Sequence, residues 1–155
     1  MTYTSTVAAQ FKDAFYAMAQ TLFANDAQVL VSYGHPGLQN QDDMILLLGV
    51  KSQQVEAAMS SSLRSRWETL ELDLFISSYR AGELDNDKVP SDRVYSLLGQ
   101  LENYVRTTDT TLGIGLQQCF LTAHDSTGST DPQVLARGRM VDCTAVFTAL
   151  VRITN

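Results

Sequence analysis

Apolar residues recur at three- and four-residue steps near the start of the chain, which is the spacing of one helical face. The stripe comprises Val7, Phe11, Ala14, Phe15, Met18 and Leu22. The pattern predicts a helix that follows N-cap candidates at Thr4 to Thr6 and ends at Asn25-Asp26. Its apolar stripe would bind a partner or pack on the protein's own sheet, and we favour packing on the sheet.

Two apolar runs of strand length follow this helix. Residues 28–33 (QVLVSY) end at a turn rich in glycine and proline at 34–37, and residues 44–50 (MILLLGV) are almost wholly apolar. The second run predicts a strand buried on both faces, with a candidate bulge at Gly49. Residues 51–65 combine serines with apolar positions that would also suit a short helix. We expect irregular structure there, leading into the next strand.

Strict alternation over residues 66–79 predicts the clearest strand of the chain. Its apolar face comprises Leu70, Leu72, Leu74 and Ile76. The opposite face comprises Trp67, Thr69, Glu71, Asp73 and Phe75. One buried face and one partly wet face are typical of an antiparallel sheet.

The rest of the chain predicts a second helix and two more strands. An acidic loop at 81–90 precedes a helix at 92–106 that Ser91-Asp92 would cap, and a polar break at 107–111 follows. Strands are expected at 112–124 and 139–153, joined by a loop that begins at 125–132. This order predicts an α+β fold in one domain over residues 1–155. Its sheet would be mixed and mainly antiparallel, with two helices packed on one face.

The amino-acid composition limits the kinds of partner that this protein is expected to bind. Hydrophobic residues make up 45% of the chain and charged residues 18%, and the net charge is -6. A surface with few charges suggests that partners cover part of it. The chain has no run of lysines and arginines, which disfavours a protein that grips DNA. An acidic protein can still line a channel through which DNA slides, because like charges prevent adhesion.

No recognisable catalytic or metal-binding motif is present in the sequence. It has neither a nucleophile elbow nor a phosphate-binding loop. His35 and His124 are far apart along the chain, so a metal site that combines them with Asp42 or Asp125 is disfavoured. We therefore expect a protein that is not an enzyme and that needs no cofactor.

Two pairs of residues still invite a chemical interpretation. Glu71 and Asp73 share a strand face and could form a general-acid pair, but a solvated or interface-facing strand is favoured. Cys119 and Cys143 lie inside apolar alternation, which predicts buried and unreactive thiols. If 112–124 and 139–153 form a hairpin around Asp131, the two cysteines would face each other across it, without a disulfide.

The N-terminus shows no basic segment followed by an apolar stretch, so no signal peptide is expected. No apolar run approaches the roughly 20 residues that span a membrane. These observations favour synthesis and action in a reducing cytoplasm, and no contact with a membrane.

Four stretches of the chain, taken in order, resemble the tail terminator proteins of long-tailed bacteriophages. They are VLVSYGHPG, RWETLELDLFISSYRAGE, VPSDRVYSLLGQLENYVRTTDTTLG and RGRMVDCTAVFTALVRI. The resemblance covers nearly the whole chain and rests on the pattern and order of elements, since this family has no invariant catalytic motif.

The resemblance implies a structural virion protein that is assembled in the host cytoplasm and becomes part of the tail and neck. Six copies would form a ring on the last ring of the tail tube and stop tube polymerisation. The ring would offer a joining surface to the head-completion (stopper) protein, and DNA would pass through its lumen without specific binding. The expected partners are therefore further copies of this chain, the tail tube protein and the stopper protein.

A closed ring of identical subunits needs two different surfaces on each subunit. The candidate subunit interface is the wet strand face with Trp67, Glu71, Asp73 and Phe75, because exposed aromatic side chains are common at interfaces. The alternative is that residues 51–65 cover Trp67 and Phe75. Candidate contacts with the tube or the stopper lie in and beside the two long loops: Arg80, Glu83, Asp85, Asp87, Asp125, Asp131 and Arg137.

Two other functions stay open at this point. The chain has the size and composition of other neck components, such as a head–tail connector or a stopper protein. A small ligand-binding or hydrolytic domain is the third candidate, and it rests only on the scattered acids and histidines.

Overall fold

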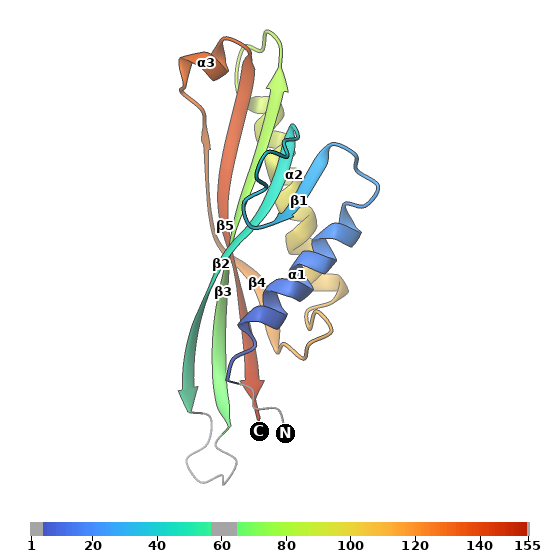
Figure 1. The fold of residues 1–155 in the computed structure, drawn as a ribbon, viewed down its shortest axis with the longest axis vertical. Helices are drawn as coiled ribbons and strands as arrows, with labels where there is room; N and C mark the ends of the chain where they lie inside the picture. Colours follow the sequence, from blue (N-terminus) through green and yellow to red (C-terminus); the bar gives the residue numbers. More distant parts are fainter. Residues whose placement is uncertain (1–4, 57–64, 155) are drawn as a thin grey trace.

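The computed structural model describes residues 5–56 and 65–154. A five-stranded sheet in the order β1-β2-β3-β5-β4 forms its centre (Figure 1). The strands are β1 Val29–Tyr33, β2 Asp43–Glu56, β3 Arg66–Ala81, β4 Gln118–Gly128 and β5 Gly138–Ile153. Among the strands of the described residues, β1 and β2 alone run parallel, and each other neighbouring pair is antiparallel.

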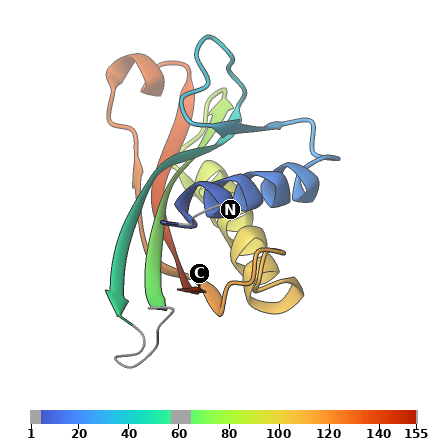
Figure 2. The same cartoon turned by 60° about the horizontal axis from the view of Figure 1, so that its bottom comes forward.

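Two long helices, α1 Ala8–Leu22 and α2 Lys88–Asn103, lie on the same side of this sheet (Figure 2). We call that side the inner face and the opposite side the outer face. A short π-helical turn, Tyr104–Thr108, follows α2, and the four-residue helix α3 Pro132–Leu135 lies in the β4–β5 connection. The predicted α+β fold, with a mixed and mainly antiparallel sheet and two helices packed on it, is confirmed.

The core fills the space between the inner face and the two helices. The stripe of α1 contributes Phe11 and Phe15, and the Phe15 ring lies 5.0 Å from the ring of Phe147 on β5. On α2, Leu97 and Leu101 are fully buried. The apolar stripe of α1 therefore packs on the protein's own sheet, as the sequence favoured.

The alternation predicted for the two longest strands is also confirmed. Leu70 and Leu72 on β3 are fully buried and pair with Ala149 and Phe147 on β5. Burying such side chains on adjacent strands stabilises the fold by roughly 1.5–3 kcal/mol for each large residue. The predicted bulge at Gly49 is present, because the β2–β3 register shifts between Leu47 and Val50.

The expectation of irregular structure over 51–65 is wrong for its described part. β2 continues to Glu56 and stays paired with β3, where Glu56 lies opposite Arg66. Residues 51–56 are all exposed and, apart from Val55, polar, so the strand lacks the alternating apolar side chains by which a strand is recognised in sequence. Its backbone is held by the neighbouring strand instead. Residues 57–64 lie outside the described part of the chain.

The second helix begins earlier than the sequence indicated. It starts at Lys88, with Asp87 at the N-cap position, so Ser91 and Asp92 lie inside the helix and do not cap it. Pro90 sits in the first turn, where its missing N–H removes no helical hydrogen bond. Proline therefore marks a helix start here and not the end of a loop.

The fourth strand is displaced from its predicted position. Residues 112–115 form turns, residues 116–117 are irregular, and β4 runs through half of the expected loop to Gly128. Leu112, Gly113 and Gly115 have positive φ angles of 48°, 71° and 78°. Such backbone is not extended, so the strand begins only after it.

Candidate functional site

The outer face of the sheet is the surface on which the predicted interface residues meet. Trp67, Glu71, Asp73 and Phe75 all project from β3 on this side, while α1 and α2 cover the other (Figures 1 and 2). Trp67, Asp73 and Phe75 are half-buried, and Glu71 is exposed. Half-buried Val146 and Leu150 of β5 lie beside them in register with Asp73 and Thr69.

Trp67 packs against neighbouring strands and is not covered by a helix. The Arg152 guanidinium on β5 lies 5.9 Å from the centre of its ring, and Val55 on β2 is its partner on the other side. The described part of 51–65 therefore flanks Trp67 within the sheet. An apolar ring between a cation and an exposed valine is a surface that a partner can cover.

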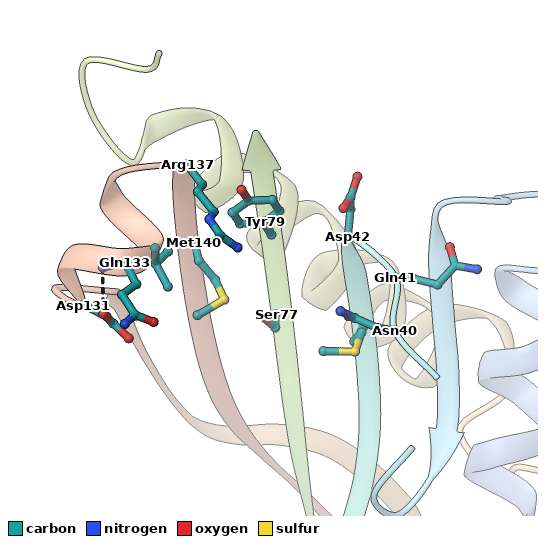
Figure 3. Close-up of a pocket in the computed structure, with 11 residues that line it drawn as sticks. Asn40, Gln41, Asp42, Ser77, Tyr79, Asp131, Gln133, Arg137 and Met140 are labelled. Atoms are coloured by element: carbon teal, nitrogen blue, oxygen red, sulfur yellow. Dashed lines mark hydrogen bonds between the residues drawn. The ribbon is translucent and has the colours of Figure 1, made fainter. Parts of the chain in front are cut away.

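A cavity of about 420 Å³ opens at one end of the outer face (Figure 3). Met44, Ser77 and Met140 lie on its strands, and the loop before β2 and the α3 segment form its walls. Its lining residues are Asn40, Gln41, Asp42, Met44, Ser77, Tyr79, Asp131, Gln133, Val134, Arg137 and Met140. Apolar side chains in its base and polar groups on its rim suit the docking of a protein segment.

Two of the predicted tube or stopper contacts, Asp131 and Arg137, belong to this cavity. Asp131 caps α3, because its carboxylate accepts a hydrogen bond of 2.9 Å from the backbone N–H of Gln133. Figure 3 shows both residues on the α3 side, across from Asn40 and Asp42. The structure thus brings two predicted loop contacts together with the segment before β2, which the sequence did not single out as a contact.

Arg80 projects to the inner face and has an internal partner. Its guanidinium donates to both carboxylate oxygens of Asp43, Nη1 to Oδ1 at 2.7 Å and Nη2 to Oδ2 at 3.1 Å. Arg93 on α2 donates from Nε to the same carboxylate at 2.8 Å and also pairs with Asp26. Ser78 Oγ donates to Asp43 at 2.7 Å.

This cluster ties α2, β2, β3 and the α1–β1 loop together around a fully buried carboxylate. Burial raises the pKa of Asp43, but the hydrogen bonds from Arg80, Arg93 and Ser78 outweigh it and hold the pKa below its ordinary value. The sequence interpretation missed Asp43, Arg93 and Asp26. The available signal was a pair of aspartates, Asp42-Asp43, at the start of an apolar run.

The acidic loop before α2 does not form one cluster with the cavity. Glu83 and Asp85 are exposed, and Asp87 is half-buried against Gly128 at the end of β4. Within the described chain, Oδ1 of Asp87 has no hydrogen-bond partner. Asp125 projects from β4 opposite Thr144, on the outer face. The predicted tube or stopper contacts therefore do not form one site: Asp87 and Asp125 lie at β4, whereas Asp131 and Arg137 line the cavity.

Glu68 is a second buried carboxylate that the sequence interpretation missed. It accepts hydrogen bonds from the Val7 N–H at 2.9 Å, from Ser52 Oγ at 2.5 Å, and from the Thr6 hydroxyl. Burial raises its pKa, and these hydrogen bonds outweigh burial and lower it. A carboxylate at a helix N-terminus is stabilised by the helix dipole. The signal was a glutamate on the apolar face of the 66–79 pattern.

The start of the first helix has two hydrogen-bond acceptors, one of which the sequence predicted. Val7 holds the N-cap position without a side-chain cap, but the candidate Thr6 beside it accepts from a first-turn N–H; Thr4 lies outside the described residues. Thr6 Oγ1 accepts from the Ala8 N–H at 3.1 Å and donates to Glu68. Glu68 on β3 supplies the second acceptor, to the Val7 N–H, because the helix start lies on the inner face.

Each of the two histidines contacts a neighbouring residue of the fold. His35 Nδ1 accepts from the Gly37 N–H at 3.0 Å, and His124 makes an edge contact with Tyr95. Over residues 5–56 and 65–154, no group of three or more His, Cys, Asp or Glu side chains has the geometry of a metal site.

Both cysteines are buried and free, as expected. Burial raises the pKa of Cys119 to about 12 and also raises that of Cys143. Their predicted juxtaposition is wrong, because Cys119 lies opposite Ala149 and Cys143 opposite Ser126. The displaced start of β4 and a register shift between Leu121 and Ala123 account for the difference.

Comparisons with protein-family models and with curated protein sequences find no match for this chain. In the described part of the chain, no helix has the length and apolar character needed to cross a bilayer.

Proposed function

We propose that this protein is a structural virion component that caps the tail tube of a long-tailed phage as a ring. The ring ends tube polymerisation and provides the surface to which the head-completion protein joins. The observation that supports this proposal best is the outer face of the sheet. It presents Trp67, Phe75, Val146 and Leu150, all half-buried, on a side that neither α1 nor α2 covers.

The mixed character of this face suits a surface that is covered on assembly. Aromatic and aliphatic side chains are enriched at the centres of interfaces, with polar groups around them. Here Glu71, Asp73 and Lys51 lie among the apolar residues. The order of elements that resembles tail terminators and the net charge of -6, which disfavours adhesion to passing DNA, support the same proposal.

The cavity at the end of the outer face supplies a second surface. A ring on a tube contacts different partners above and below, so each subunit needs a docking site at an end of the sheet as well as contacts with its neighbours. Asp131 and Arg137 on the cavity rim serve as tube or stopper contacts under this proposal.

Binding to isolated phage structures tests the proposal. The purified protein is mixed with purified tail tubes and, separately, with heads that carry the portal and its adaptor. A tail terminator binds tube ends, and native mass spectrometry detects its ring. Binding only to the portal side would identify a stopper or connector instead. A strict monomer that binds neither structure at any concentration would contradict the proposal.

A further inference from the structure

Two strand edges of this protein have no described neighbour, and they lie on opposite sides of the sheet. β1 pairs only with Asp43–Leu47, so residues 48–56 of β2 have no described strand on that side. β4 is the last strand on the other side and pairs only with β5. An edge strand presents unpaired N–H and C=O groups, which are a template for pairing with another chain.

The two open edges occur at the same level of the sheet. Gln53 of β2 pairs with Thr69, Thr69 with Leu150, and Leu150 with Gln118 of β4. Two residues further along, the same row runs from Lys51 through Glu71 and Thr148 to Phe120. At this level the described sheet is four strands wide and has an open edge on each side.

The directions of these strands fit a head-to-tail contact between copies. β2 is antiparallel to β3, β3 to β5, and β5 to β4, so β2 and β4 run in opposite directions. If neighbouring copies in a ring are related by rotation about an axis parallel to the strands, each strand points the same way along that axis in every copy. β2 of one subunit would therefore meet β4 of the next as an antiparallel pair, which is the more stable arrangement.

Exposed apolar side chains gather on both edges. Leu48 is 38% exposed and Val55 is 64% exposed on β2, and Phe120 is 41% exposed on β4. Neither edge contains proline, which would prevent pairing. The contact joins two different surfaces of the same chain, as a closing ring requires.

We propose that residues 48–56 of β2 pair with β4 of a second copy of this chain and extend the sheet from subunit to subunit. This inference rests on the proposed ring, and it places the contact between copies at the sheet edges instead of on the outer face with Trp67 and Phe75. The unshifted register places Gln53 beside Gln118 and Lys51 beside Phe120 of the next copy. A tilt of the strands against the ring axis shifts this register by an even number of residues, because an odd shift would exchange the two faces.

Cysteine cross-linking under ring-forming conditions tests the pairing. In the double variant Gln53→Cys/Gln118→Cys, oxidation is expected to give a ladder of covalent oligomers up to the size of the ring. The double variant Gln53→Cys/Phe120→Cys tests the register shifted by two residues in the same way. An equimolar mixture of two single variants should stop at covalent dimers. Neither single variant alone should cross-link, since a subunit's β2 does not meet another β2. The native cysteines are buried and do not interfere.

The matched control is Gln53→Cys/Tyr33→Cys, in which the second cysteine is also at an exposed position but lies on β1. It should give no ladder. Rings that assemble without cross-linking of either test variant would overturn the inference and leave the proposed function standing. Dimers from Gln53→Cys alone would overturn it in favour of a two-fold contact. A protein that forms no ring even on tail tubes would overturn both.

Discussion

Arg93 on α2 donates a hydrogen bond of 2.8 Å from Nε to Oδ2 of Asp43, a carboxylate with no exposed surface. Arg80 donates to the same carboxylate from β3. The contact fixes the N-terminal half of α2 against β2 and β3, two of the strands that border the outer-face cavity. Asp42, the neighbour of Asp43, lines that cavity, so the buried cluster positions a surface proposed to bind partners.

Replacing Asp43 by asparagine should destabilise the fold by about 3 kcal/mol, because two arginines lose a buried counter-charge. Urea unfolding followed by circular dichroism measures the change. Asp42→Asn is the matched control, since Asp42 is exposed, and it should change the free energy of unfolding by less than about 0.5 kcal/mol. Equal effects of the two variants would show that the cluster does not stabilise the fold.

Asp43 should also contribute to the pH dependence of stability. Its pKa is lower in the folded protein than in the unfolded chain, so its contribution is fully present above the unfolded-state value, near 4. The contribution is lost as the pH falls from there through the folded-state pKa. Unfolding measured between neutral pH and pH 2 should show a smaller loss of stability in Asp43→Asn than in the wild type. Parallel curves would contradict this assignment.

Glu68→Gln should weaken the start of α1, because the buried carboxylate that accepts from Val7, Thr6 and Ser52 becomes neutral. We expect a loss of about 1–3 kcal/mol in the free energy of unfolding. Glu71→Gln on the same strand, at an exposed position, should be nearly neutral. Hydrogen exchange of the first turn of α1 should accelerate in Glu68→Gln only.

Two glycine substitutions should change the free energy of unfolding in opposite directions. A Cβ on Gly138 would lie 2.1 Å from the carbonyl oxygen of Arg80, so Gly138→Ala forces the β3–β5 pair apart and should cost about 1–3 kcal/mol. Gly99 lies inside α2 with open space around it, so Gly99→Ala should stabilise the protein by roughly 0.5–1 kcal/mol. Thermal unfolding of both variants checks the difference in sign.

Phe120→Lys should separate assembly from folding. Phe120 is partly exposed on the β4 edge, so the stability of the monomer should change by less than about 0.5 kcal/mol. The variant removes an exposed apolar side chain from the proposed contact, and in the unshifted register it also places a second cation beside Lys51 of the next copy, so ring formation should weaken. Leu38→Lys is the control, because Leu38 is fully exposed in the β1–β2 loop, away from both edges. Rings that form as readily in Phe120→Lys as in the wild type would contradict the proposed pairing.

Sequence pattern alone was enough to predict the elements that alternate or repeat on one face. The 139–153 strand begins within one residue of its predicted start, and the α1 stripe packs as expected. Residues 51–56 were missed because both of their faces are exposed, and their pairing with β3 is a long-range relationship. The start of β4 was missed because positive φ angles at Gly113 and Gly115 interrupt an apolar run.

The candidate surfaces were only partly predictable. Alternation placed Trp67, Glu71, Asp73 and Phe75 on one face without knowledge of the structure. The same alternation, continued past Ile76, puts Arg80 on the apolar face, but no local pattern could identify its partner Asp43, which is 37 residues away. The cavity likewise depends on segments that only the fold brings together, residues 40–42 and 131–140.

The most direct test of the central claim is the length of tail tubes polymerised in the presence of this protein. Purified tube protein is assembled with and without it, and tube lengths are measured by negative-stain electron microscopy. We expect shorter tubes, each with a ring of this protein at one end, and shortening that depends on the concentration of this protein. Tubes of unchanged length with bare ends, at a protein concentration well above that of tube ends, would contradict that claim.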